Sequence, residues 1–266
     1  MGVEDLLSPQ GARARIAEVE LARPFAWVAR GWADFRAAPL ASAFYGAAFA
    51  AMGWALLALF DFAHQYVPTL ACSFLLAGPF LATGLYALSR DRELGRRPAL
   101  ARSLLAWREN PGALGIYVLV LTVIVLVWAR ASLVVFALFH TGSMPDLRGF
   151  LGQAFSLANL EFVLAWFASG SVFAAIVFAA SVVSVPMMLD RRNDAVSAAL
   201  LSAACLARNL PAMLLWAAII VAFTAAGLAT AFVGLVLTMP VIGHATWHAY
   251  RDCIGWSDDP AAAGTP

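Results

Sequence analysis

The sequence has no lysine and little charge of either sign. All 17 basic residues are arginine, 16 acidic residues nearly balance them, and charged residues make up only 12% of the 266 positions. Nucleic-acid binding requires a concentrated basic face, which a net charge of +1 does not supply. We therefore expect no nucleic-acid partner.

Residues that carry chemistry are also scarce. The three cysteines, Cys72, Cys205 and Cys253, are widely spaced and form no CxxC motif, so neither a disulfide framework nor a thiolate zinc site is indicated. The sequence shows no Ser-His-Asp pattern, phosphate-binding loop, dinucleotide fingerprint or HExxH motif. We expect free thiols, no cofactor and no enzymatic activity.

Apolar residues are plentiful instead. They make up 62% of the chain, against roughly 45–50% in soluble domains. The long apolar stretches, each sufficient for the roughly 20 residues that cross a bilayer, are 40–60, 67–89, 113–139, 162–189 and 211–250. The last stretch would reach about 60 Å as one helix, so we expect two crossings with a tight turn near Gly227–Thr230. This predicts an all-α polytopic membrane protein with six transmembrane helices.

The arginines give an orientation. Apart from Arg130 and Arg148, the other 15 of the 17 arginines lie before residue 40, within 90–110 and 190–210, or in the C-terminal tail. The positive-inside rule places these segments, and therefore both termini, in the cytoplasm. Arginine in place of lysine, together with abundant alanine, is typical of a GC-rich bacterial genome, so we expect multi-pass insertion in a bacterial inner (cytoplasmic) membrane.

A short pattern recurs three times at equivalent points. An Arg-x-x-Pro entry precedes each odd-numbered span, and a second proline lies late in each even-numbered span. The helix-entry residues are Arg36 and Pro39, Arg108 and Pro111, and Arg208 and Pro211, and the later prolines are Pro79, Pro186 and Pro240. We expect three parallel-repeat hairpins, each preceded by a cytoplasmic amphipathic interfacial helix.

The repeats would divide a membrane domain at residues 15–255 into units of about 15–92, 93–194 and 195–255. Residues 1–14 and 256–266 are expected to be disordered tails. In the first entry helix an apolar face is formed by Phe25, Val28, Trp32 and Phe35. Such a helix would lie in the headgroup plane, with membrane lipids as its partners.

Two stretches carry a family resemblance. They are Gly-Trp-x-Asp-Phe-x-x-x-Pro at 31–39 and Gly-Pro-Phe-x-x-x-Gly-Leu-Tyr-x-x-Ser-Arg-x-x-Glu-x-Gly at 78–95. The chain resembles the bacterial integral membrane proteins catalogued as domain of unknown function 2189, over about residues 15–255. Some members are labelled as cytochrome c oxidase subunit I. The resemblance implies a fold and a membrane location but transfers no catalytic residue, and four histidines are too few for a haem-copper catalytic subunit.

His244 and His248 are one helical turn apart in GHATWHAYRD and could share a metal ion. An open metal site needs a third ligand, for which Asp252 and Asp190 are the nearest candidates. Trp247 and Tyr250 beside them are typical of an interfacial belt. We expect the interfacial arrangement, with a metal or haem site as the alternative.

Two further features invite a functional interpretation. Arg130 is the only arginine or acidic residue inside a predicted span, near the outer interface, where it could snorkel or pair with Glu161. Pro79, Pro186 and Pro240 could free carbonyl groups around a central cavity, or could simply kink their helices.

The sequence therefore supports two functions. The first is a non-catalytic accessory, assembly or scaffold component of a larger membrane complex, for example a respiratory one, with other membrane proteins as partners. The alternative is a channel, transporter or lipid-handling protein with a central pseudo-threefold cavity.

Overall fold

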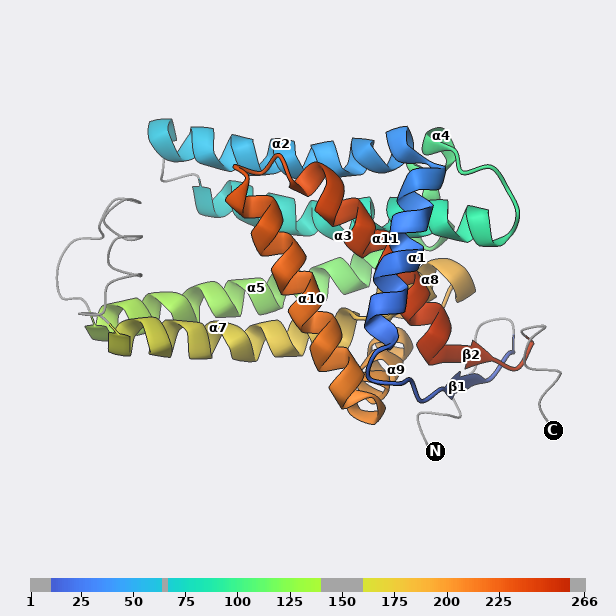
Figure 1. Ribbon diagram of the computed structural model, residues 1–266. Coiled ribbons are helices and arrows are strands. Elements are labelled where there is room, and N and C mark those ends of the chain that lie inside the picture. The colour runs from blue at the N-terminus through green and yellow to red at the C-terminus, as the bar shows by residue number, and fades with distance from the viewer. Residues whose placement is uncertain (1–10, 64–66, 140–159, 259–266) are drawn as a thin grey trace.

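The computed structural model describes residues 11–63, 67–139 and 160–258, with the backbone alone at 60–63 and 67–76. It is built almost entirely of helices (Figure 1). The elements in chain order are β1 (Ala14–Ile16), α1 (Arg23–Ala37), α2 (Pro39–Ala63), α3 (Val67–Glu93), α4 (Leu100–Ser103), η3 (Ala106–Glu109), α5 (Pro111–Phe139), α7 (Leu160–Ser181), α8 (Ser184–Arg191), α9 (Ala195–Arg208), α10 (Leu210–Ala229), α11 (Leu235–Cys253) and β2 (Ile254–Trp256).

Three helical hairpins dominate the arrangement. Helix α2 packs on α3, α5 on α7, and α10 on α11, while α1 runs across the hairpins at one end of the molecule (Figure 1). Shorter helices precede each hairpin: α1, then α4 with η3, then α9. This order agrees with the hairpins expected from the sequence, whereas a repeat relationship among them stays a prediction.

Four helical segments are long and apolar enough to cross a bilayer. They are Pro39–Leu59, Pro111–Phe139, Leu160–Arg191 and Leu210–Ala229. The length and composition of these helices fit a polytopic membrane protein of the all-α class. The two other expected crossings correspond to α3 and α11, and their status as spans stays a prediction.

Prolines stand at the start of the three hairpins. Pro39 and Pro111 open α2 and α5, and Pro211 is the second residue of α10. A proline is favourable there because the N–H groups of the first helical turn have no acceptor within the helix, so the N–H that proline lacks is not needed. Among the later prolines, Pro186 follows a break between α7 and α8, but Pro79 and Pro240 lie inside α3 and α11 without ending them.

The turn expected near Gly227–Thr230 is confirmed, because α10 ends at Ala229 and α11 begins at Leu235. Ala231 and Phe232 take positive φ angles of 52° and 69°. The indole Nε1 of Trp54 donates a hydrogen bond of 2.8 Å to the carbonyl of Ala231. This bond fastens the tip of the third hairpin to α2.

The aromatic core lies at the charged end of the bundle. Its largest fully buried side chains include Trp27, Trp216, Trp247 and Tyr250. Trp27 and Trp216 pack edge to face with ring centroids 5.7 Å apart. The interfacial belt expected for Trp247 and Tyr250 is therefore wrong, because both rings are buried inside the molecule and donate hydrogen bonds to Glu93 and Asp190.

The two ends of the described chain meet in a small antiparallel ribbon. Ala14 of β1 pairs with Trp256 of β2, and Ile16 pairs with Ile254. Ala14 and Trp256, which the sequence analysis placed in disordered tails, are buried in this ribbon. Residues 1–10 and 259–266 of those tails lie outside the described residues.

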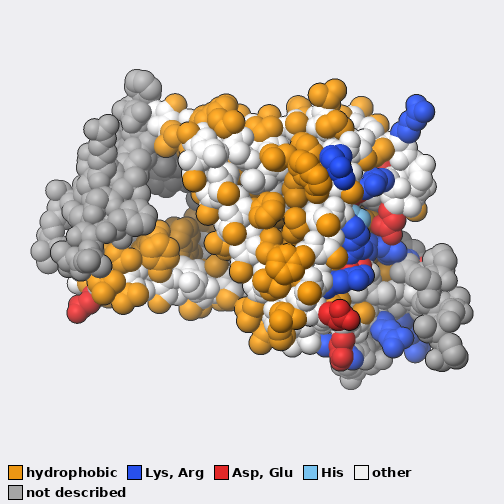
Figure 2. Space-filling model, in the orientation of Figure 1, with side chains coloured by type: hydrophobic (Ala, Val, Ile, Leu, Met, Phe, Trp, Pro, Cys, Tyr) orange, Lys and Arg blue, Asp and Glu red, His pale blue; other side chains and the backbone are white. Residues whose placement is uncertain are grey.

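Charge is concentrated on the same end. Figure 2 shows most arginines and carboxylates gathered beside α1, the end of α11 and the ribbon, while the rest of this face is apolar. The molecule thus has a long apolar part and a short polar part, and the polar part holds the candidate site.

Candidate functional site

Helix α11 carries a histidine into the centre of the charged end. His244 is 0% exposed. Its Nε2 lies 2.9 Å from the hydroxyl of Ser42 on α2, and its Nδ1 lies 2.7 Å from the hydroxyl of Ser89 on α3. A neutral imidazole has one donor and one acceptor, so the two hydroxyls satisfy both of its nitrogens.

Asp34 of α1 is the hub of the surrounding network. Its buried carboxylate is bonded by Nε2 of His248 at 2.9 Å, by Arg92, and by Ser89. Burial alone would raise the pKa of Asp34, but the hydrogen bonds from His248, Ser89 and Arg92 outweigh it and hold that pKa below its ordinary value. Asp34 is therefore ionised at neutral pH.

These groups form one continuous chain. Ser89 interacts with Asp34, and its hydroxyl lies 2.7 Å from Nδ1 of His244. The Nε2 atom of His244 lies 2.9 Å from the hydroxyl of Ser42. The chain joins α2, α11, α3 and α1, and we call its members, with Arg92 and His248, the Asp34 cluster.

A polar pocket of about 470 Å³ opens beside the Asp34 cluster. It is lined by Arg30, Ala33, Asp34, Ser89, Arg92, Glu93, His248 and Arg251. Glu93 accepts hydrogen bonds from Nε of Arg251 at 2.9 Å and from the indole Nε1 of Trp247 at 2.7 Å. We call this space the cluster pocket.

A second carboxylate, Asp252, fixes α1 to the end of α11. It accepts from Nε of Arg23 at 2.7 Å, from the indole of Trp27 at 2.7 Å, and from Arg30. Burial opposes its ionisation, but the Arg30, Arg23 and Trp27 hydrogen bonds lower the pKa of Asp252, and the same contact raises the pKa of Arg23. Arg30 therefore binds Asp252 and also lines the cluster pocket.

The geometry gives a shared metal site on His244 and His248 no support. His244 faces two serines and His248 faces Asp34. Asp252 is held by arginines, and Asp190 accepts from the hydroxyl of Tyr250 at 2.7 Å. Across the described residues, no three His, Cys, Asp or Glu side chains are grouped as metal ligands.

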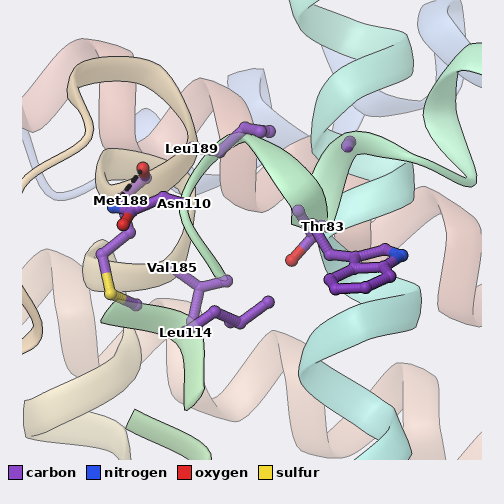
Figure 3. A pocket seen from close by; sticks show the side chains of 8 residues that line it. Thr83, Asn110, Leu114, Val185, Met188 and Leu189 are labelled. Atoms are coloured by element: carbon purple, nitrogen blue, oxygen red, sulfur yellow. Dashed lines mark hydrogen bonds between the residues drawn. The ribbon is translucent and has the colours of Figure 1, made fainter. Parts of the chain in front are cut away.

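Figure 3 shows a very small cavity whose lining includes Thr83, one helical turn after Pro79, and Val185, next to Pro186 in the chain. The Thr83 hydroxyl donates to the carbonyl of Pro79 at 2.6 Å, and Asn110 donates to the carbonyl of Met188 at 3.1 Å. The space has a volume of about 10 Å³ and is lined by Thr83, Ala106, Trp107, Asn110, Leu114, Val185, Met188 and Leu189. That volume suits about one water molecule, not a solute passage.

The other singled-out residues lie at the surface. Each entry arginine has a partner: Arg36 lies 6.0 Å from the Trp32 ring, Arg108 lies 5.4 Å from the Trp107 ring, and Arg208 lies 3.3 Å from Glu18.

Arg130 and Glu161 are both exposed, and the structure shows no ion pair between them. Arg130 lies nine residues before the end of α5, about 14 Å by helical rise. Glu161 lies instead near that end, where Phe139 and Phe162 have ring centroids 5.9 Å apart. The two side chains are therefore at different heights along the hairpin.

Sequence reasoning identified His244 and His248 but missed Asp34, Ser42, Ser89 and Arg92. A signal was present, because Asp34 lies in the quoted Gly-Trp-x-Asp-Phe run and Ser89 in the Tyr-x-x-Ser-Arg run. In the structure both runs contact α11, through the Asp34–His248 and Ser89–His244 hydrogen bonds. Cys205 and Cys253 are free and buried, and the side chain of Cys72 lies outside the described residues.

Comparison with known families supports the membrane assignment. Residues 66–190 match the family described as predicted integral membrane protein (DUF2189). The resemblance to DUF2189 is confirmed. The DUF2189 match covers α3 to α8 and so includes Ser89 and Arg92, whereas α1, α2 and α11 lie outside it. No curated protein and no solved structure matches the chain.

Proposed function

We propose that the protein is a non-catalytic accessory, assembly or scaffold component of a larger complex in a bacterial inner membrane, for example a respiratory one. The chain crosses the membrane six times, with both termini and the Asp34 cluster on the cytoplasmic side. The arginine distribution and the gathering of charge at one end (Figure 2) support this orientation.

The observation that carries the proposal is the close packing around α11. A Cβ atom added at Gly46 of α2 would lie 2.2 Å from the Val236 carbonyl oxygen, and one added at Gly31 of α1 would lie 2.7 Å from the Ala245 nitrogen. The backbones are therefore in direct contact at these crossings. A solute path between α11 and these neighbours has no room, which favours a scaffold over a channel.

The outer surface of the second hairpin supplies the complementary observation. In the most apolar window of α5 no residue is buried inside the molecule. Side chains such as Val123 and Leu126 are each 53% exposed. This face is available to lipid and to the helices of a partner protein.

A hydrolytic role is disfavoured by burial. Ser42 and His244 are hydrogen-bonded as a nucleophile and its base would be. Both are 0% exposed, so no substrate reaches the hydroxyl in this structure. We assign the pair to helix packing.

The alternative is a channel, transporter or lipid-handling protein, and the cluster pocket favours it. This pocket is large enough for a small polar group, but it lies at the charged end of the molecule. Ligand handling at that pocket is compatible with a scaffold role.

Photo-crosslinking in intact cells tests the proposal. A photoreactive amino acid at Leu126, exposed on α5, is expected to give one adduct with a second, defined protein chain. The same group at Leu114, 4% exposed on the same helix, is the matched control and should give none. Lipid adducts alone at Leu126 would contradict a stable partner on this face.

A further inference from the structure

We propose that the cluster pocket binds the phosphate of a phospholipid headgroup from the cytoplasmic leaflet. The inference does not depend on a partner complex. It goes beyond the scaffold role because it gives the charged end a ligand of its own.

The charges lining the pocket favour an anion. Three arginines, Arg30, Arg92 and Arg251, face two carboxylates, Asp34 and Glu93. The formal charges of these five lining side chains sum to +1. Phosphate oxygens are well matched to guanidinium groups, which can donate two parallel hydrogen bonds.

Arg92 also retains donors for a ligand. A guanidinium has five N–H donors. Arg92, 43% exposed, directs Nη1 to Asp34, and no other donor of Arg92 has a partner among the described residues. Asp34 and Asp252 hold Arg92 and Arg30 in place, so little side-chain entropy is lost when a phosphate binds.

The position of the pocket favours a lipid as the source of the phosphate. Its walls come from α1, α3 and α11 at the charged end of the molecule, next to which Figure 2 shows a broad apolar surface. Helix α1 also exposes Phe25 and Trp32, 61% and 39% exposed, as an interfacial helix would. A pocket at this depth meets headgroups, which are far more concentrated there than dissolved phosphate.

Three probes distinguish a lipid headgroup from dissolved phosphate as the source of the bound phosphate. The full-length protein in detergent is titrated with dioctanoyl phosphatidylglycerol, with dioctanoylglycerol, and with inorganic phosphate, and its thermal unfolding is followed. The phospholipid is expected to raise the unfolding temperature saturably, and the other two at equal concentration are not. An equal effect of dioctanoylglycerol would overturn the phosphate assignment, and an equal effect of inorganic phosphate would overturn the lipid source.

Variants locate the site. Arg92→Gln is expected to weaken phospholipid binding about tenfold, because it removes a charge-assisted hydrogen bond. Arg30→Gln serves as a second pocket variant if Arg92→Gln fails to fold. Arg36→Gln, which changes an arginine on α1 outside the pocket, should bind like the wild type. Equal weakening in all folded variants would indicate non-specific attraction and overturn the proposal.

Discussion

Asp34 and His248 lie 214 positions apart in the sequence and are joined by a hydrogen bond of 2.9 Å between Oδ2 and Nε2. The bond connects the last turn of α1 to the last turns of α11. With Arg92 and Ser89 it makes the buried carboxylate of Asp34 the point where α1, α3 and α11 are held together.

Removing this carboxylate should therefore destabilise the charged end. Asp34→Ala is expected to lower the free energy of unfolding by about 3 kcal/mol, because Arg92 and His248 would lose their common partner. Thermal unfolding in detergent measures the change. Glu161→Ala, at an exposed acidic residue, is the matched control and should leave the unfolding temperature unchanged.

Stability should also fall in acid. The folded-state pKa values of Asp34 and Asp252 are lowered below 3.8. The stabilisation they give is therefore complete above their ordinary pKa and is lost as the pH falls through the lowered values. We expect a level unfolding temperature between about pH 5 and pH 8 and a decline below about pH 4.

Asp34→Asn tests the origin of that decline. The variant should be less stable at neutral pH and should lose less stability on acidification than the wild type. An identical decline in both proteins would show that Asp34 does not contribute to it.

The helix crossings can be tested with glycine substitutions. Gly46→Ala should cost about 1–3 kcal/mol, because the added methyl group would collide with the backbone at Val236. Gly112→Ala on α5, where nothing lies within 4 Å of the new atom, should be neutral or slightly stabilising. Equal effects at both positions would contradict tight packing around α11.

The six-span topology makes a prediction about the chain ends. A green fluorescent protein fused after Pro266 should fluoresce, since that end is placed in the cytoplasm. Alkaline phosphatase inserted in the segment 140–159 should be active, since we place this segment outside. An active phosphatase fused after Pro266 would contradict the cytoplasmic placement of that end.

The sequence predicted the helices better than their packing. The apolar stretches predicted the positions of α5 and α10, and the Arg-x-x-Pro pattern predicted where α2, α5 and α10 begin. Both predictions succeeded because each depends only on residues that are close together in the sequence. The burial of His244 and Trp247 could not be read from α11 itself. It depends on α1 and α3, which supply Asp34 and Ser89 from more than 150 residues away.

The pairing of β1 with β2 could not be predicted from the sequence either. Each strand has three residues, too few for a periodic pattern, and the strands lie at opposite ends of the chain. The cluster pocket was missed for the same reason, since no two of its three helices are neighbours in the sequence.

The central claim is that the protein works as part of a larger membrane complex. The most direct test is native mass spectrometry of the full-length protein released from its own membrane in lipid nanodiscs. The account predicts a mass equal to this chain plus at least one different protein chain in fixed ratio. A mass equal to the chain alone, or to copies of it with lipid only, would contradict the claim.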